Sequence, residues 1–255
     1  MDAIHSRTWA YENIYNIEKE NENLEISFDN KIIPKGSQLI SDFFTLKFGA
    51  KLYEIGKGVP AQTKEDAKSK IYESITKIDS SYIELLRARD IKRYRKTESN
   101  YFVKYGENLA APRSKDIFTT QRILVNRIIG KKYLDATIEN KFKISNTDVI
   151  ILLPKQNDVD LYFFLGIIGS KYLSNVLKSI NVNLDRNAYP KINTETLGMF
   201  PIPKNLEIQV KISNAVKYIY ENDPNDLINL ESQIDQLIYH LYELTEEEIK
   251  NIEYN

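Results

Sequence analysis

Short apolar runs separated by turn residues fill the first part of the chain, which is the pattern of a β-rich segment. Alternation of apolar and polar positions predicts strands over 51–55, 101–105 and 136–143, and a mostly apolar run predicts another over 122–129. The run 149–153 (Val-Ile-Ile-Leu-Leu) is apolar throughout, which is typical of a strand buried on both faces. A glycine directly follows three of these segments, so we expect them to end in turns.

A helical period replaces this pattern in the second part of the chain. Apolar residues recur at spacings of three and four, which predicts amphipathic helices over 161–177, 208–219 and 227–241. The prolines in 201–203 form a rigid joint, and a capping box at 245–248 begins a final short helix. The stripe over 227–241 has a near-heptad spacing that suits packing on a partner protein or on the body of the same chain. Both alternatives remain open from the sequence.

The order of these elements predicts an α+β fold, in which a mixed β-sheet with flanking helices is followed by a helical C-terminal tail. We expect a leader segment over residues 1–50, an α+β domain over 51–203 and the tail over 204–255. The first 30 residues are acidic and rich in asparagine, so we expect the leader to pack loosely. A polar stretch over 62–70 is expected to be a loop or a short helix.

Charge is distributed unevenly along the 255 residues, although the net charge is only −1. Residues 86–145 carry 15 lysines and arginines against 6 acidic residues, a local charge of +9. Residues 221–255 carry 1 basic residue against 10 acidic residues, a local charge of −9. A one-sided basic surface is the feature expected of a protein that neutralises phosphate groups. The alternative is an ordinary solvated charged face.

Composition excludes several classes of chemistry. The chain has no cysteine and two histidines, His5 and His240, so disulfides, thiolate catalysis and the usual zinc sites are excluded. Charged residues interrupt the N-terminus, and no apolar run approaches the ~20 residues that span a bilayer. We therefore expect a cytoplasmic protein without a membrane partner. The sequence has neither an Asn-Pro-Pro-aromatic motif nor a glycine-rich cofactor loop, so we expect no cofactor and no catalysis in this chain.

One catalytic constellation is left as an alternative. Asp116, Glu139 and Lys141 have the residue types of a small metal-dependent DNA nuclease, in which two carboxylates hold Mg²⁺ and a lysine orients the attacking water. Short Glu-x-Lys strings are frequent, however, in a chain with 35 basic and 36 acidic residues. An exposed strand face is therefore the favoured interpretation of these three residues.

The basic segment offers a larger set of candidates for DNA contact. Its densest part is 87–96, and further cations follow a proline and a glycine in predicted loops, where they can reach phosphates and groove edges. Arginine can read guanine with two hydrogen bonds, whereas lysine mainly supplies charge. We expect Arg89 to read a base, with a structural arginine tied to Asp90 as the alternative, and we expect Lys92 and Lys132 to bind phosphate. The predicted DNA-binding residues are Lys57, Gln62, Lys64, Arg87, Arg89, Lys92, Arg93, Arg95, Lys96, Arg113, Lys115, Arg122, Lys131 and Lys132.

Six short motifs along the chain together resemble a known family. They are RDIKRY at 89–94, YFVKYGENLAAPR at 101–113, QRILVNR at 121–127, FFLGIIGSKYLSNVL at 163–177, YPKI with FPIP between 189 and 203, and IDQLIYHLYELT at 234–245. In this order they resemble the target-recognition domains of type IIG restriction–modification enzymes and adenine-specific DNA methyltransferases, the TaqI-like C-terminal specificity domain. Ala88 and Gly169 depart from this pattern, because the family has glycine and asparagine at these positions.

The resemblance implies sequence-specific recognition of double-stranded DNA by a domain that performs no chemistry itself. It also implies a methyltransferase or nuclease half, in the same or a partner polypeptide, where S-adenosylmethionine and Mg²⁺ would bind. The segment 1–50 is too short to hold such a half. A third alternative is an interaction subunit, whose basic face binds nucleic acid without sequence specificity while its acidic tail docks a partner.

Overall fold

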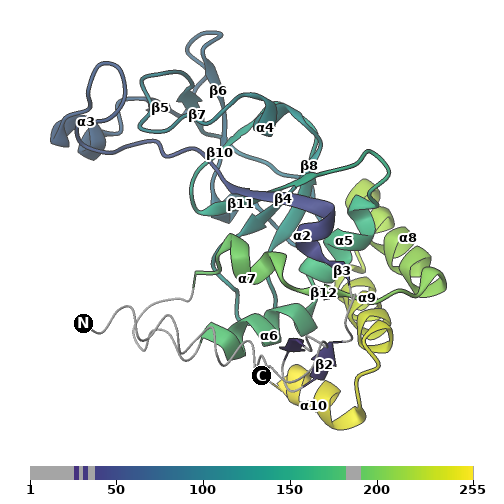
Figure 1. The fold of residues 1–255 in the computed structure, drawn as a ribbon. Helices are drawn as coiled ribbons and strands as arrows, with labels where there is room; N and C mark the ends of the chain where they lie inside the picture. The colour runs from purple at the N-terminus through teal and green to yellow at the C-terminus, as the bar shows by residue number, and fades with distance from the viewer. Residues whose placement is uncertain (1–25, 29–30, 34–37, 182–190, 255) are drawn as a thin grey trace, which may run out of the picture.

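The computed structural model describes residues 26–28, 31–33, 38–181 and 191–254, and these residues have the predicted α+β fold. A central antiparallel sheet lies between a second sheet on one face and a group of helices on the other (Figure 1). The order of the central sheet is β4-β11-β8-β9, and its strands are β4 (Phe44–Phe48), β8 (Arg122–Asn126), β9 (Ala136–Glu139) and β11 (Val149–Pro154).

Side chains of the central sheet alternate between the two layers. Ile123 and Val125 of β8 pack on the helices, whereas Leu124 packs toward the second sheet. The neighbouring strand β11 alternates in the same way over 149–153. Both faces of the sheet are covered, so this run is a strand buried on both faces, as its composition predicts.

The second sheet lies at the end of the molecule remote from the C-terminal helices (Figure 1). Its order is β10-β6-β7-β5, with β10 parallel to β6 and the other pairs antiparallel. Its strands are β5 (Glu73–Ser74), β6 (Tyr82–Leu86), β7 (Phe102–Lys104) and β10 (Ile144–Ser145). Residues 52–81, which we call the distal lobe, contain the short helix α3 (Lys64–Ser69) expected within 62–70. The Thr63 hydroxyl caps α3 by accepting the Asp66 amide at 3.1 Å.

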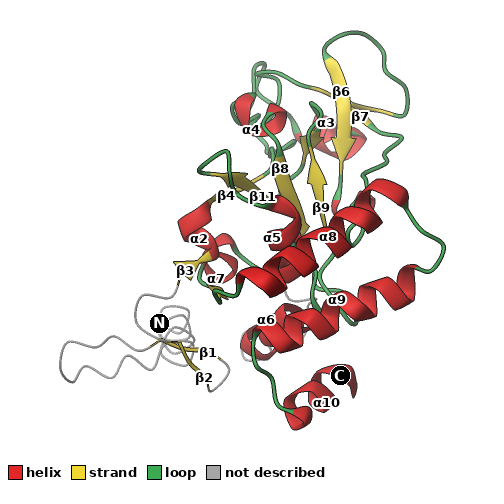
Figure 2. Cartoon of the chain, turned by 90° about the vertical axis from the view of Figure 1, so that its right-hand side faces the viewer, coloured by secondary structure: helices red, strands yellow, loops and turns green. Residues whose placement is uncertain are grey.

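The helical layer covers the other face of the central sheet (Figure 2). Its helices are α5 (Leu161–Ile168), α6 (Lys171–Asn181), α8 (Leu206–Asn222), α9 (Leu227–Leu241) and α10 (Glu246–Tyr254). Gly166 permits the close crossing of α5 and α8, because a Cβ there would lie 2.5 Å from Cγ2 of Ile212. The stripe of α9 is buried in the core of this layer through Ile234, Ile238 and Leu241. Of the two alternatives for this stripe, the structure shows packing on the body of the same chain.

The single helix predicted over 161–177 is instead two helices, α5 and α6, that meet at Gly169 and Ser170. Gly169 lies against the ring of Tyr94, and a Cβ at this position would be 2.5 Å from the ring atom Cε1. The Ser170 hydroxyl accepts the amide of Leu173 at 3.1 Å, which is an N-terminal cap for a new helix. Close packing and capping therefore break a helix that the apolar spacing predicts to be continuous.

Part of the expected leader over 1–50 belongs to the body of the protein. Strand β4 pairs with β11 along its whole length, and Phe44 is buried in the helical-side core. Strand β3 (Gln38–Leu39) pairs with β12 (Pro201–Ile202). The first 25 residues of the expected leader lie outside the described residues, and the division into domains stays a prediction.

Residues 51–55 do not form the predicted strand, because only Lys51 makes a β-bridge, to Ala111. The remaining short elements are β1 (Ile26–Phe28), β2 (Lys31–Ile33), α2 (Ile40–Phe43), the 3₁₀ turn η1 (Ala88–Asp90), α4 (Asp116–Thr119) and α7 (Thr194–Gly198). Every helix in the part of the chain that the structure describes is too short or too polar to cross a bilayer.

Candidate nucleic-acid interface

Residues 87–96, which we call the basic loop, follow β6 and are held to the central sheet by their backbone. The amide of Tyr94 donates to the carbonyl of Ala136 in β9 at 2.9 Å, and the ring of Tyr94 is fully buried. The exposed cations of the loop are Arg89, Lys92, Arg95 and Lys96. The loop therefore has a fixed inner side and a cationic outer side.

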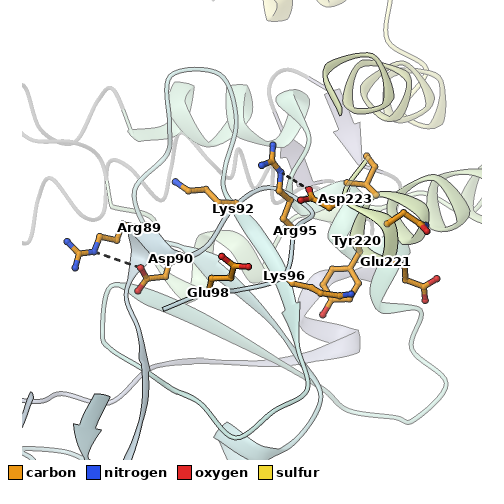
Figure 3. Close-up of a pocket in the computed structure, with 11 residues that line it drawn as sticks. Arg89, Asp90, Lys92, Arg95, Lys96, Glu98, Tyr220, Glu221 and Asp223 are labelled. Carbon is orange, nitrogen blue, oxygen red and sulfur yellow. Dashed lines mark ion pairs between the residues drawn. The ribbon is translucent and has the colours of Figure 1, made fainter. Parts of the chain in front are cut away.

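The exposed cations line a pocket of about 480 Å³, which we call the basic pocket and whose other wall is the C-terminal end of α8 (Figure 3). The Arg95 guanidinium lies 3.7 Å from the carboxylate of Asp223, and both side chains are exposed. The Lys96 ammonium lies 5.6 Å from the centroid of the Tyr220 ring. The lining residues are Arg89, Asp90, Lys92, Arg95, Lys96, Glu98, Ile219, Tyr220, Glu221, Asn222 and Asp223. The basic pocket thus brings four cations opposite an acidic helix end, which also carries the negative pole of the helix dipole.

Tyr101 supports the two arginines at the start of the basic loop. The guanidinium carbons of Arg87 and Arg89 lie 3.9 Å and 4.9 Å from the centroid of its ring. Arg89, and less strongly Arg87, lowers the pKa of Tyr101 by hydrogen bonding and by charge. Arg87 is also ion-paired with Glu73 of β5, whereas the Arg89 side chain is 59% exposed. Arg89 is therefore the more exposed of the two, and it is held by its contact with the Tyr101 ring and by an ion pair with Asp90 at 3.8 Å (Figure 3).

The other exposed cations of the predicted set lie on separate loops. Arg113 precedes α4 and donates weakly to the Gly49 carbonyl at 3.4 Å, and the Lys115 ammonium lies 5.0 Å from the centroid of Phe142. The members of the predicted DNA-binding set that are exposed outside the basic loop are Arg113, Lys115, Lys131 and Lys132, together with Lys57 and Lys64 in the distal lobe. Whether any of these residues contacts DNA stays a prediction.

Gln62 and Arg122, two of the predicted DNA-binding residues, have structural roles instead. The Gln62 amide is 2% exposed and donates to the carbonyls of Leu52 and Asn108 at 2.9 Å and 2.7 Å, which closes the distal lobe. Arg122 is fully buried and donates to three main-chain carbonyls at 3.0–3.2 Å. Burial lowers the pKa of Arg122 to about 10, so the group stays charged at neutral pH. Neither side chain presents a free donor to a ligand at the surface.

Arg93 is the third predicted DNA-binding residue that the structure assigns to the interior. Its side chain is 2% exposed, and its guanidinium donates to Asp235 of α9 at 2.7 Å and to Glu231 at 3.3 Å. Burial opposes the charge on Arg93, but Tyr94 and these two carboxylates outweigh burial and raise its pKa. Arg93 is therefore a charged contact between the basic loop and the tail helices.

The nuclease alternative is not supported by the geometry. The Glu139 carboxylate is buried and accepts hydrogen bonds from the Thr97 hydroxyl and from two main-chain amides, with the Lys143 ammonium at 3.4 Å. Burial would raise the pKa of Glu139, but the Thr97 hydroxyl and the neighbouring donors outweigh it and lower the pKa. Asp116 is exposed at the start of α4 and Lys141 is exposed beyond β9. Over the described ranges, no three His, Cys, Asp or Glu side chains form a group that could hold a metal ion.

The acidic wall of the basic pocket was not among the predicted site residues. Tyr220, Glu221 and Asp223 lie more than 100 positions after the basic loop, at the end of α8. The one signal in the sequence is the helix stop at Asp223 and Pro224, which places an acidic residue at a helix end. That signal gives no indication of which part of the chain the helix end faces.

Part of the chain is similar to known proteins. The sequence profile of the TaqI-like C-terminal specificity domain matches residues 83–202. The type II methyltransferase M.MjaIV of Methanocaldococcus jannaschii is 28% identical over 149 residues, which cover 52% of this chain and 49% of that protein. The chain therefore spans about half the length of this relative.

Two solved structures are similar to this chain at low TM-score and low identity. The type IIL restriction-modification enzyme MmeI in complex with DNA has a TM-score of 0.49 at 12% identity, over 87% of this chain and 35% of that chain. The HsdS subunit from Thermoanaerobacter tengcongensis has a TM-score of 0.38 at 10% identity, over 98% of this chain and 47% of that chain.

The segment that matches the family profile begins in β6 and ends in β12, so it contains the basic loop, three strands of the central sheet and helices α5 and α6. The motifs that carry the resemblance in the sequence fall largely within this segment. Residues 83–202 of this chain are therefore a TaqI-like C-terminal specificity domain.

Proposed function

We propose that this chain recognises a base sequence in duplex DNA, as the specificity part of a restriction–modification enzyme. The observation that carries the proposal is that the basic loop lies inside the specificity domain, residues 83–202. Four exposed cations gather there beside one pocket. Duplex DNA carries about one negative charge per 1.7 Å of its axis, so a local group of cations supplies much of the affinity for it.

The exposed cations of the basic loop divide by chemistry into two roles. Lys92 and Lys96 carry compact ammonium groups, which bind phosphates without regard to sequence. Arg89 carries a planar fork that can donate two hydrogen bonds to guanine. Its stacking on Tyr101 restrains the guanidinium before DNA arrives, which lowers the entropy lost on binding. We assign base reading to Arg89 and phosphate binding to the lysines.

The cations on the other loops extend this assignment. Lys131 and Lys132 follow β8 of the central sheet, and Arg113 and Lys115 follow β7 of the second sheet, so they lie on loops from different sheets. We propose that they contact phosphates on either side of the site read by the basic loop. Lys57 and Lys64 of the distal lobe are proposed as outer contacts of the same kind.

Methylation and cleavage are proposed to occur in another part of the enzyme. M.MjaIV, about twice as long as the segment that matches, is named as a methyltransferase. The Glu139 carboxylate already accepts hydrogen bonds on both of its oxygens, so Asp116, Glu139 and Lys141 do not fit Mg²⁺. We propose that S-adenosylmethionine and Mg²⁺ bind to a methyltransferase or nuclease half, in the same or a partner polypeptide, and that this half forms the other wall of the DNA cleft.

Equilibrium binding to duplex DNA over a range of salt concentrations tests the proposal. The variant Lys92→Gln/Arg95→Gln/Lys96→Gln is expected to lower the slope of log K against log salt by ~2–3, about 0.9 for each phosphate contact. A control variant, Lys155→Gln/Lys204→Gln/Lys211→Gln, removes the same charge from exposed positions outside the basic pocket. Equal weakening in both variants would show that the basic pocket is not the DNA surface.

A further inference from the structure

Arg93 lies in the middle of the basic loop but its side chain points into the protein. The guanidinium lies between two aromatic rings, 4.7 Å from the centroid of Tyr94 and 4.5 Å from that of Tyr133. One amino group donates to Asp235 at 2.7 Å, across 142 positions of the sequence. The other lies 3.3 Å from the Glu231 carboxylate. Two rings and two carboxylates therefore hold both amino groups of this guanidinium, while its buried Nε has no hydrogen-bond partner among the residues that the structure describes.

The carboxylate of Asp235 connects three segments of the chain, namely α9, the basic loop and the start of α6. It is fully buried on α9, accepts the Arg93 guanidinium, and accepts the main-chain amide of Lys171 at 3.0 Å at the start of α6. The Lys171 ammonium lies 4.0 Å from its second oxygen and 2.6 Å from Glu253 of α10. The basic loop is thus connected through one buried carboxylate to three helices of the helical layer.

The next residue, Tyr94, holds the loop at a second point. Its hydroxyl donates to the carbonyl of Gly166 at 3.0 Å, and its ring fills the space left by the missing side chain of Gly169. Its backbone has a positive φ of 61°, a conformation that a bulky residue adopts only when its surroundings impose it. Arg93 and Tyr94 therefore fix the backbone from which Lys92 and Arg95 leave toward the basic pocket.

Stability alone is a poor explanation for this arrangement. A buried ion pair loses the hydration of both charges, and replacing such a pair by well-packed apolar residues is often neutral or stabilising. Here the pair joins helix α9 to the loop that carries the exposed cations. The location of the pair suits a contact that fixes the conformation of the basic loop.

We propose that the Arg93–Asp235 ion pair is a positioning contact, through which helix α9 holds the basic loop in the arrangement that binds DNA. The proposal rests on the proposed DNA-binding function. It assigns no DNA contact to either residue. It also gives the tail helices a role in recognition, although their acidic residues would be repelled by phosphates.

The decisive variant is Arg93→Met/Asp235→Leu, which removes both charges and keeps the site filled with apolar side chains. Urea unfolding first establishes that this variant is folded. Hydrogen–deuterium exchange of the loop amides, among them Tyr94 N–H, and the Kd for duplex DNA are then measured. We expect faster exchange over 87–96 and a Kd about ten-fold higher, because a loop that is competent for about a tenth of the time binds about ten-fold more weakly. Glu207→Gln/Lys211→Gln, which removes an exposed ion pair of α8, should match wild type in both measurements.

A folded double variant with the Kd of wild type overturns the proposal, whatever its exchange rates. If the double variant does not fold, Arg93→Lys decides the question, because it keeps the charge and loses the planar fork. Faster loop exchange and weaker binding in that variant support the proposal, and wild-type values overturn it. If wild type binds no duplex DNA at all, the proposed function fails. The exchange measurement, which needs no DNA, still tests whether the pair holds the loop.

Discussion

Asp223 is expected to weaken DNA binding, and its neutralisation should strengthen it. The carboxylate lies at the end of α8, 3.7 Å from the Arg95 guanidinium and on the wall of the basic pocket (Figure 3). In the free protein it competes with a phosphate for Arg95, and in the complex it repels the DNA backbone. Asp223→Asn keeps the size and polarity of the side chain and removes the charge.

The magnitude of this effect follows from the distance and from the exposure of the pair. Two unit charges about 4 Å apart in water interact with ~1 kcal/mol, and exposed ion pairs contribute ~0.2–1 kcal/mol when measured. The Arg95 and Asp223 side chains are 44% and 76% exposed, so the value for water applies. At about 1.4 kcal/mol for a factor of ten, Asp223→Asn should lower Kd by at most ~5-fold at low salt.

Fluorescence anisotropy with a labelled duplex measures this change directly. The matched control is Glu207→Gln, which removes an exposed acid near the other end of the same helix. At 1.5 Å per residue the two positions are ~24 Å apart along α8, well beyond the ~10 Å over which 0.1 M salt screens charges. The gain should therefore appear only for Asp223→Asn and should disappear at high salt. Equal gains from both variants, or no gain from Asp223→Asn, would refute the location of the DNA surface at the basic pocket.

Three further changes have defined outcomes. Lys92→Ala should weaken all duplexes about equally and lower the salt slope by ~1, as a set of binding titrations at several salt concentrations would show. Gly169→Ala places a methyl group 2.5 Å from the Tyr94 ring and should destabilise the protein by ~1–3 kcal/mol in urea unfolding, whereas Ala88→Gly should cost less than about 1 kcal/mol. The lowered pKa of Glu139 means that its ionised form stabilises the fold above its ordinary pKa of 4.5, and that this contribution is lost as the pH falls through the lower folded value. Glu139→Gln should therefore reduce the loss of stability between about pH 6 and pH 3, as urea unfolding at several pH values would show. The same loss of unfolding free energy in the variant and in wild type would contradict this.

The tail helices show what the sequence predicts well. The apolar spacing and the stop at Asp223 and Pro224 predict helices within a few residues of α8 and α9, because each has one buried face and a clear end. The capping box also forms, since the Glu248 carboxylate accepts the Thr245 amide at 2.6 Å. These signals involve residues that are close in the sequence, so they do not depend on the fold of the rest of the chain.

Residues with distant partners could not be placed from the sequence. Strand β6 has only five residues and is absent from the predicted strands. Its segment forms a strand only by pairing with β7 and with the two-residue strand β10. The burial of Arg93 depends on Asp235, which is 142 positions away, and no charge count distinguishes Arg93 from its exposed neighbours. The same holds for Gln62, whose side-chain amide donates to the carbonyl of Asn108, 46 positions away. The sequence therefore located the basic segment but not which of its cations face solvent.

Selection from a pool of random duplexes tests the central claim most directly. Wild type and the variant Arg89→Gln are each incubated with the pool at low salt, and the bound duplexes are sequenced. Sequence-specific recognition through the basic loop, with Arg89 as the base reader, predicts that wild type enriches a common short motif and that the variant loses the preference at one position of that motif. Binding by wild type without enrichment of any motif would contradict the account and would favour an interaction subunit that binds nucleic acid by charge alone.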